Sequence, residues 1–138
     1  MVMALNVEQL EFLRSARAEA FLAMPLPSDP LAAQEALRKE CERSEAEAVG
    51  RLRRLRRRAA SKFPPALAER LLATDKLLQQ ASSLRLAVYV GRSLREATGA
   101  ADVADLCCGV GADAVGLAMA GFRVAGYASS AAAIVCDA

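Results

Sequence analysis

The stretch Val103-Ala-Asp-Leu-Cys-Cys-Gly-Val-Gly-Ala-Asp113 decides the fold, because it has the pattern of a strand, a glycine turn and the start of a helix. Gly109 and Gly111 free the backbone to turn sharply and to approach a ligand, and Asp113 is positioned to cap the following helix. This order of elements is typical of a nucleotide-cofactor site. The apolar side chains that suit a strand covered on both faces are Val103, Leu106, Cys107 and Cys108.

Short apolar runs separated by glycines continue beyond this turn. They predict a strand at 103–107, a helix at 113–120, a second strand at 122–127 and the start of another helix at 130–136. A strand-helix-strand unit of this kind places its two strands parallel, which makes the fold class α/β. Two parallel strands do not complete a sheet, so we expect the chain to be the front part of a longer protein.

Residues 1–99 have helical periodicity and predict a separate helical module before the Rossmann-like segment of residues 100–138. Asp29 followed by Pro30 is a helix start, and Ser44 with Glu47 has the form of a capping box. The expected helices are 7–23, 29–41, 44–62, 65–73 and 75–98, the last with a break near Ser82-Ser83 or at Gly91.

The composition supports a division into two different parts. Residues 1–100 hold 17 of the 18 basic and 12 of the 16 acidic side chains, so the remainder is nearly free of basic residues. The hydrophobic content of 54% is enough for a core, and because aromatics make up only 4% we expect helices that pack closely through alanine.

The four cysteines show neither a disulfide framework nor the paired spacing of a zinc site. The chain has no histidine to activate a thiolate, so Cys107 and Cys108 are expected to be buried packing residues and no metal is expected. The start of the chain lacks the features of a secretory signal, and glycines interrupt the apolar stretch at 114–135. We therefore expect a cytoplasmic protein without a membrane span.

Spacing alone leaves three interpretations of the glycine turn open: a dinucleotide site, a site for another nucleotide cofactor, and a turn that binds no ligand. Gly109-Val-Gly-Ala-Asp-Ala114 satisfies the dinucleotide fingerprint, with alanine at the third small position. A tight strand-to-helix connection without a ligand would use the same glycines. Asp105 lies four residues before Gly109, near the end of a strand that dinucleotide folds usually keep apolar. This acid favours a different cofactor from NAD.

The segment Asp105-Leu-Cys-Cys-Gly-Val-Gly111 resembles the first motif of class I S-adenosylmethionine-dependent methyltransferases, in the form seen in RNA methyltransferases. The resemblance implies that the loop backbone lies against the methionine part of the cofactor and that the acid helps to hold its amino group. Cys107 stands where a glycine is common in the wider family. The cofactor-binding residues implied by the resemblance are Asp105, Cys107, Gly109, Gly111 and Asp113.

The sequence before this motif is similar to bacterial methyltransferases with a THUMP-like domain. The similarity rests on Leu52-Arg-Arg-Leu-Arg-Arg-Arg-Ala-Ala-Ser-Lys-Phe63, on Thr74 and on Leu78-Gln-Gln-Ala-Ser82. It covers most of this chain and only the front of such a protein. It implies methyl transfer to a base nitrogen of tRNA or rRNA, with the target-holding residues beyond Ala138, so the isolated chain is expected to lack turnover.

One position departs from the pattern of the family. An acid usually follows the second strand and accepts hydrogen bonds from the ribose hydroxyls, but here Ala128 follows Tyr127. Ser129 or Ser130 offers only a weaker hydrogen bond. We therefore expect a lower affinity for a ribose-containing cofactor.

A dense basic cluster extends from Arg51 to Lys62. Its candidate nucleic-acid-binding residues are Arg54, Arg57, Arg58 and Lys62. The alternative is a solvated helix face that is paired in part with Glu45 and Glu47. The second functional hypothesis is therefore a helical nucleic-acid-binding module whose cofactor motif is only structural; with so few aromatic side chains, its RNA contact would be electrostatic and salt-dependent.

Overall fold

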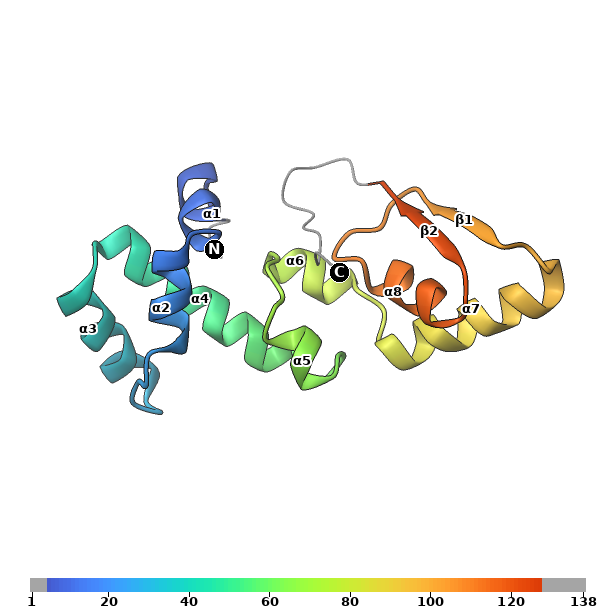
Figure 1. Cartoon of the computed structure of the whole chain (residues 1–138). Helices are drawn as coiled ribbons and strands as arrows, with labels where there is room; N and C mark the ends of the chain where they lie inside the picture. Colours follow the sequence, from blue (N-terminus) through green and yellow to red (C-terminus); the bar gives the residue numbers. More distant parts are fainter. Residues whose placement is uncertain (1–4, 128–138) are drawn as a thin grey trace. The chain divides into compact units, whose positions relative to one another are not determined.

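The computed structural model describes residues 5–127 and shows an α/β fold, mostly helical, with one small parallel sheet (Figure 1). The chain divides into two compact units, Met1–Leu55 and Arg56–Ala138, and the division falls within a helix. The elements are α1 (Val7–Leu13), α2 (Ala16–Ala23), α3 (Pro30–Glu40), α4 (Arg43–Ala59), α5 (Pro65–Ala68), α6 (Asp75–Gln80), α7 (Leu84–Thr98), β1 (Asp102–Asp105), α8 (Ala112–Met119) and β2 (Arg123–Gly126).

The first unit packs its helices around buried leucine, valine and alanine side chains. The single helix expected at 7–23 is wrong, because Ser15 ends α1 and begins α2. Its Oγ accepts a hydrogen bond of 3.2 Å from the backbone N–H of Ala18, and its own N–H donates to the carbonyl of Phe12. The apolar spacing continues through this break, so periodicity could not reveal it. The residues buried in this unit are Leu13, Ala18, Leu37, Ala46, Ala48, Val49, Leu52 and Leu55.

The expected start of α3 is confirmed, and that of α4 is wrong. Asp29 caps α3, since its Oδ2 accepts a hydrogen bond of 2.7 Å from the backbone N–H of Ala32. The capping box expected at Ser44 does not form, because α4 begins one residue earlier, at Arg43. Glu45 takes the reciprocal role, with its Oε2 accepting a bond of 3.1 Å from the backbone N–H of Glu42. One of the two hydrogen bonds of a capping box is therefore present, between Glu42 and Glu45 instead of between Ser44 and Glu47.

The second unit contains α5 to α8 and the sheet. The helix expected at 75–98 breaks at Ser82-Ser83, the first of the two positions considered. Ser83 caps α7 by accepting a hydrogen bond from the N–H of Leu86, while Gly91 lies within α7. The helix expected at 65–73 is shorter and ends at Ala68.

The two strands are parallel, as predicted, with Asp102 beside Arg123 and Asp105 beside Gly126. The expectation of a strand buried on both faces is wrong: β1 alternates between exposed and half-buried residues, and Leu106 is 71% exposed. Within residues 5–127, α8 packs on the sheet, and no second layer covers its other face. The burial of a strand depends on which elements cover the two faces of its sheet, and the local sequence of the strand does not reveal them.

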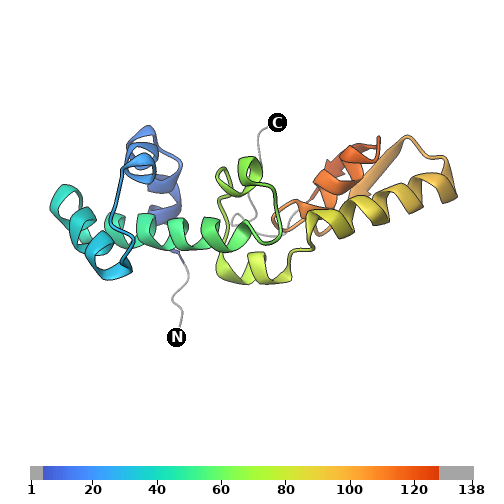
Figure 2. The ribbon, with the colours of Figure 1, turned by 90° about the horizontal axis from the view of Figure 1, so that it is seen from below.

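Helices α7 and α8 lie side by side at backbone contact (Figure 2). A Cβ atom added at Gly116 would lie 2.5 Å from the carbonyl carbon of Ala87 and 2.8 Å from its oxygen. A Cβ added at Gly91 would lie 3.0 Å from the carbonyl oxygen of Gly116. This pair of glycines allows α8 to sit between α7 and the sheet, and so fixes where the turn before α8 lies.

None of the helices within residues 5–127 has the length and apolar character required to cross a membrane. The apolar stretch at 114–135 is interrupted as expected, since its described part forms most of α8, a turn at Gly121 and β2. The helix expected at 130–136 lies outside the described residues.

Candidate functional site

Asp105 lies at the carboxyl end of β1 and is half-buried. Its Oδ1 accepts a hydrogen bond of 3.2 Å from the backbone N–H of Cys107, and its carbonyl accepts one of 2.8 Å from the N–H of Tyr127. Its Oδ2 is buried and accepts no hydrogen bond from any residue of the described segment 5–127. A buried carboxylate oxygen without a donor is costly, so this atom is a candidate acceptor for a ligand.

The glycine turn follows directly, and both of its glycines have left-handed backbone conformations, with φ of +52° at Gly109 and +81° at Gly111. The Gly111 N–H donates to the carbonyl of Cys108 at 2.6 Å, and the Cys108 N–H donates to the carbonyl of Tyr127 at 3.1 Å. A Cβ added at Gly111 would meet nothing within 4 Å. Glycine is therefore required here by backbone conformation, and open space remains over the turn.

Helix α8 begins at this turn with unused backbone donors. Gly111 is its N-cap and supplies no side chain to cap it, and the N–H groups of Ala112, Asp113 and Ala114 donate to no residue that the structure describes. The prediction that Asp113 caps the helix is wrong. Asp113 is exposed in the first turn, where its charge favours the positive end of the helix dipole.

The two cysteines of the turn differ from each other. Cys107 was expected to be buried and is exposed, because the chain leaves the sheet after Asp105. Cys108 is half-buried, and burial, followed by the negative charge of Asp105, raises the pKa of its thiol. A thiol that holds its proton is a packing group rather than a nucleophile.

The end of β2 is bonded to the same turn through Tyr127, as described above. The residues discussed for ribose binding, Ala128, Ser129 and Ser130, lie outside the described residues. In the part of the chain that is described, no group of three metal-ligating side chains is present. The structure thus brings Asp105, Gly109 and Gly111 together around one open turn, with Leu77 of α6 at its edge.

The basic cluster is largely engaged within the protein. Lys62 closes the carboxyl end of α6: its Nζ donates to the carbonyls of Leu78 at 2.8 Å, Gln79 at 3.1 Å and Ala81 at 2.7 Å. An ammonium group has three N–H donors, and all three have partners. Arg58 forms an ion pair with Asp75. Lys62 is therefore not free to contact a phosphate without giving up these bonds, whereas the exposed guanidinium of Arg58 keeps further N–H donors beside its ion pair.

Two other arginines of α4 also bond backbone carbonyls. One guanidinium nitrogen of Arg53 donates to three carbonyls at the end of α2, the shortest bond being 2.9 Å to Met24, and Nε of Arg56 donates to Leu71 at 3.0 Å. Glu45 forms an ion pair with Arg17, and Glu47 forms ion pairs with Arg38 and Arg43, all of which precede the cluster.

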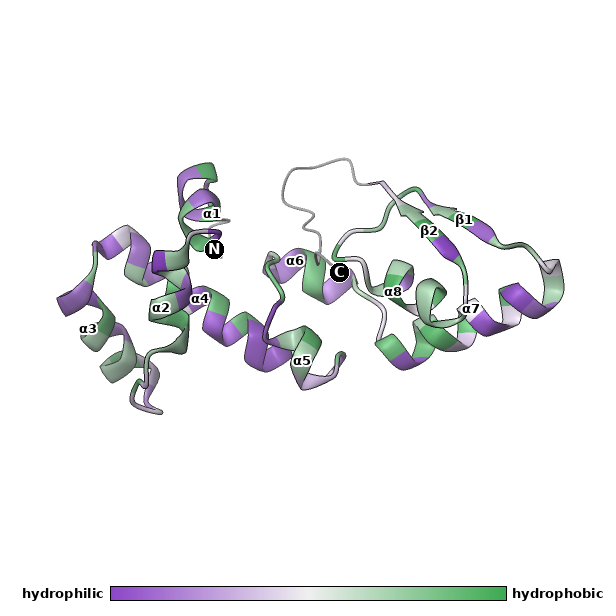
Figure 3. Ribbon diagram, in the orientation of Figure 1, coloured by the Kyte–Doolittle hydropathy of each residue, from purple (hydrophilic) through white to green (hydrophobic). Residues whose placement is uncertain are grey.

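Arg54 and Arg57 remain available. Both are exposed, and neither has a hydrogen bond or ion pair to any of residues 5–127. They lie three positions apart on α4, which is strongly hydrophilic along this stretch (Figure 3). Of the four predicted nucleic-acid-binding residues, the structure therefore leaves two with free guanidinium groups.

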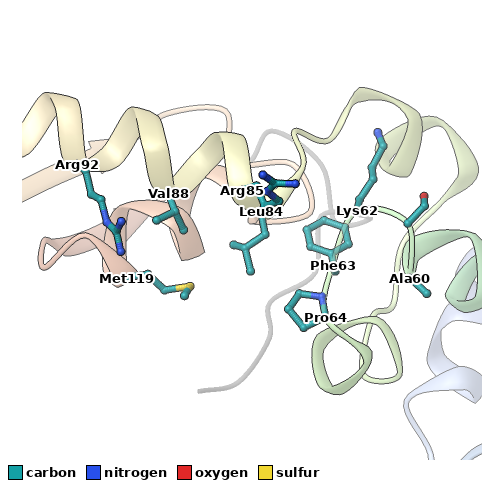
Figure 4. A pocket seen from close by; sticks show the side chains of 10 residues that line it. Ala60, Lys62, Phe63, Pro64, Leu84, Arg85, Val88, Arg92 and Met119 are labelled. Atoms are coloured by element: carbon teal, nitrogen blue, oxygen red, sulfur yellow. The ribbon is translucent and has the colours of Figure 1, made fainter.

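Sequence reasoning missed a groove that lies in the second unit, along α7 (Figure 4). Its charged residues are Arg85 and Arg92, on α7, and Lys62. The seven-residue spacing of the two arginines on one helix was a signal that they share a face, but nothing in the sequence indicated the facing wall.

No family model, curated protein or solved structure matches this chain.

Proposed function

We propose that this chain carries the S-adenosylmethionine-binding front of a class I RNA methyltransferase, with a Rossmann-like cofactor domain beginning at β1. The observation that carries the proposal is the buried Oδ2 of Asp105, which lacks a donor within residues 5–127 and belongs to the residue that enters the glycine turn. The amino group of the cofactor is a cationic donor, and a charge-assisted hydrogen bond to Oδ2 would satisfy that atom.

The turn supports the same proposal by its shape. Gly109 and Gly111 have positive φ angles, which favour glycine, and the lack of side chains leaves the backbone open to a ligand above Gly111. The unused N–H groups at the start of α8 add donors for polar groups of the cofactor. A parallel strand, a turn, a helix and a second parallel strand in this order are the first unit of such a domain.

The chemical contribution of the described residues is binding and positioning. When bound, S-adenosylmethionine supplies an electrophilic methyl group on its sulfonium. Asp105 would orient the amino group, and the backbone of the turn would hold the methionine portion against β1. We propose that the target is a base nitrogen of RNA.

Calorimetric titration with S-adenosylmethionine and, separately, with NAD tests this function. We expect S-adenosylmethionine to bind and NAD not to bind, and we expect Ala128→Asp to strengthen binding by supplying an acceptor for the ribose hydroxyls. The proposal fails if neither ligand binds even to Ala128→Asp, or if NAD binds more tightly. Methyl transfer by the isolated chain to tRNA or rRNA is not expected.

The exposed guanidinium groups of Arg54 and Arg57 favour a second candidate, a helical RNA-binding module whose glycine turn is only structural. Replacing both with alanine should weaken RNA binding and flatten its dependence on salt, because fewer counterions are released. Arg38 and Arg43, which are engaged with Glu47, provide a matched double-alanine control. Loss of RNA binding only in the first variant, together with no cofactor binding by the wild type, would favour the module.

A further inference from the structure

The groove beside α7 has apolar lining and basic residues along it. It encloses about 530 Å³ between α7, the segment 60–64 and the carboxyl end of α8. In the close-up, Arg85 and Arg92 extend from α7, and Met119 lies below Arg92 (Figure 4). The apolar residues that line the groove are Ala60, Phe63, Pro64, Leu84, Val88 and Met119. Met119 ends α8, so the groove lies at the opposite end of that helix from the glycine turn.

Backbone bonds hold the walls of the groove in place. The Leu84 N–H donates to the carbonyl of Lys62 at 3.0 Å, which ties the segment 60–64 to the start of α7. The ammonium group of Lys62 is fixed on the carbonyls that end α6. The glycine contacts between α7 and α8 fix the wall that carries Met119. A groove built in this way exists before any ligand arrives, which lowers the cost of binding.

The charge along the groove is positive and available. Arg85 and Arg92 are both exposed, and neither has an ion pair or a hydrogen bond to the described part of the chain. They are seven residues apart on one helix, a separation of about 10 Å along its axis. None of the residues lining the groove is acidic. The third basic lining residue, Lys62, is already fully bonded, so the two arginines set the charge that a ligand meets.

The apolar lining favours side chains over nucleotide bases. Phe63 is the single aromatic residue among the described residues that line the groove, so successive bases would find only one ring to stack on. The remaining apolar groups are aliphatic or thioether, and Met119 is 61% exposed and able to adapt its shape. Two arginines would also give few phosphate contacts. These features match an amphipathic peptide, whose apolar side chains fill a groove while its acids meet basic residues at the edge.

We propose that this groove binds an acidic amphipathic peptide segment of a partner protein, with its apolar side chains against Phe63, Val88 and Met119 and its carboxylates on Arg85 and Arg92. This interaction is independent of the cofactor site. A helical segment that lies along α7 would place two acids about two turns apart, on either side of an apolar pair.

Selection of peptides on the immobilised full chain tests the proposal directly. From a library of random peptides of about 16 residues, long enough for four helical turns, we expect enrichment of sequences in which acids flank apolar residues at helical spacing. Fluorescence polarisation of the most enriched peptide then measures its affinity. The Arg85→Glu/Arg92→Glu variant should bind it about tenfold more weakly or worse, because two attractive contacts become repulsive.

The Arg54→Glu/Arg57→Glu variant is the matched control, since it makes the same charge change on exposed, unpaired arginines elsewhere. It should change the affinity by less than about twofold at physiological salt. Met119→Glu tests the apolar wall and should also weaken binding, and circular dichroism of each variant shows whether the helices are retained.

Three results would overturn the proposal. One is no enrichment at all, or enrichment of peptides without acids. Another is an equal loss of affinity in the Arg54→Glu/Arg57→Glu control. The third comes from a single-stranded oligouridine probe: if Arg85→Glu/Arg92→Glu removes its binding while no peptide binds, the groove contacts nucleic acid instead.

Discussion

The glycine turn after β1 and the arginine-rich helix α4 are the two most distinctive segments of the sequence, and they differ in how many of their polar groups are bonded within the protein. At the turn, the carboxylate oxygen Oδ2 of Asp105 and the first N–H groups of α8 stay without partners among the described residues. On α4, Arg53 and Arg56 bond backbone carbonyls, and Arg58 pairs with Asp75. A dense run of basic residues in a sequence therefore does not show whether their charges are free to bind a ligand, because helix ends expose carbonyls that attract cations.

The packing of α8 against α7, which fixes the position of the glycine turn, is where a substitution should have the largest effect. Gly116→Val should lower the free energy of unfolding by about 2–3 kcal/mol or prevent folding, because the new side chain would overlap the backbone of Ala87. Ala118→Val, at an exposed position on the same helix, is the control and should cost about 0.5 kcal/mol. Urea denaturation measures both. Equal effects would mean that α7 and α8 do not pack at backbone contact.

Replacement of Lys62 should cause the next largest loss of stability. Lys62→Met keeps the length of the side chain and removes three hydrogen bonds to the end of α6, so it should destabilise the protein by about 1–3 kcal/mol. Lys76→Met, at an exposed position within α6, should change stability by less than about 0.5 kcal/mol. If instead Lys62→Met leaves thermal unfolding unchanged and weakens RNA binding, then Lys62 belongs to an RNA surface as the sequence predicted.

The smallest expected effect is the pH dependence of the ion pair between Asp102 and Arg123, which joins the two strands. Nε and one terminal guanidinium nitrogen of Arg123 donate at 2.6 and 2.8 Å, and these hydrogen bonds lower the pKa of Asp102 below its ordinary 3.8. A lowered pKa stabilises the fold above 3.8 and loses that contribution as pH falls through the lowered value.

Asp102→Asn should therefore melt slightly below the wild type at neutral pH and together with it at acid pH. Both groups are exposed, so the difference should also shrink in high salt. A difference in melting temperature that persists unchanged at acid pH would show that the ion pair does not cause it.

The sequence predicted the features that depend on local chemistry. The parallel strands, the glycine turn, the Asp29 cap and the break at Ser82-Ser83 all follow from residue types at fixed spacings, and the structure has each of them. Ser15 was missed because apolar residues at helical spacing occur on both sides of the cap. The exposure of Leu106 and the capping by Lys62 depend on segments distant in the sequence, which no local pattern encodes.

The proposed cofactor site depends most on Oδ2 of Asp105, which has no hydrogen-bond donor within residues 5–127, and calorimetric titration of S-adenosylmethionine into Asp105→Asn tests it most directly. Loss of the negative charge should weaken binding by about 10- to 100-fold relative to the wild type. Glu96→Gln, which removes an exposed acid of α7 outside the glycine turn, should bind within about threefold of the wild type. Equal affinity of Asp105→Asn and the wild type would contradict the assignment of Asp105 to the cofactor.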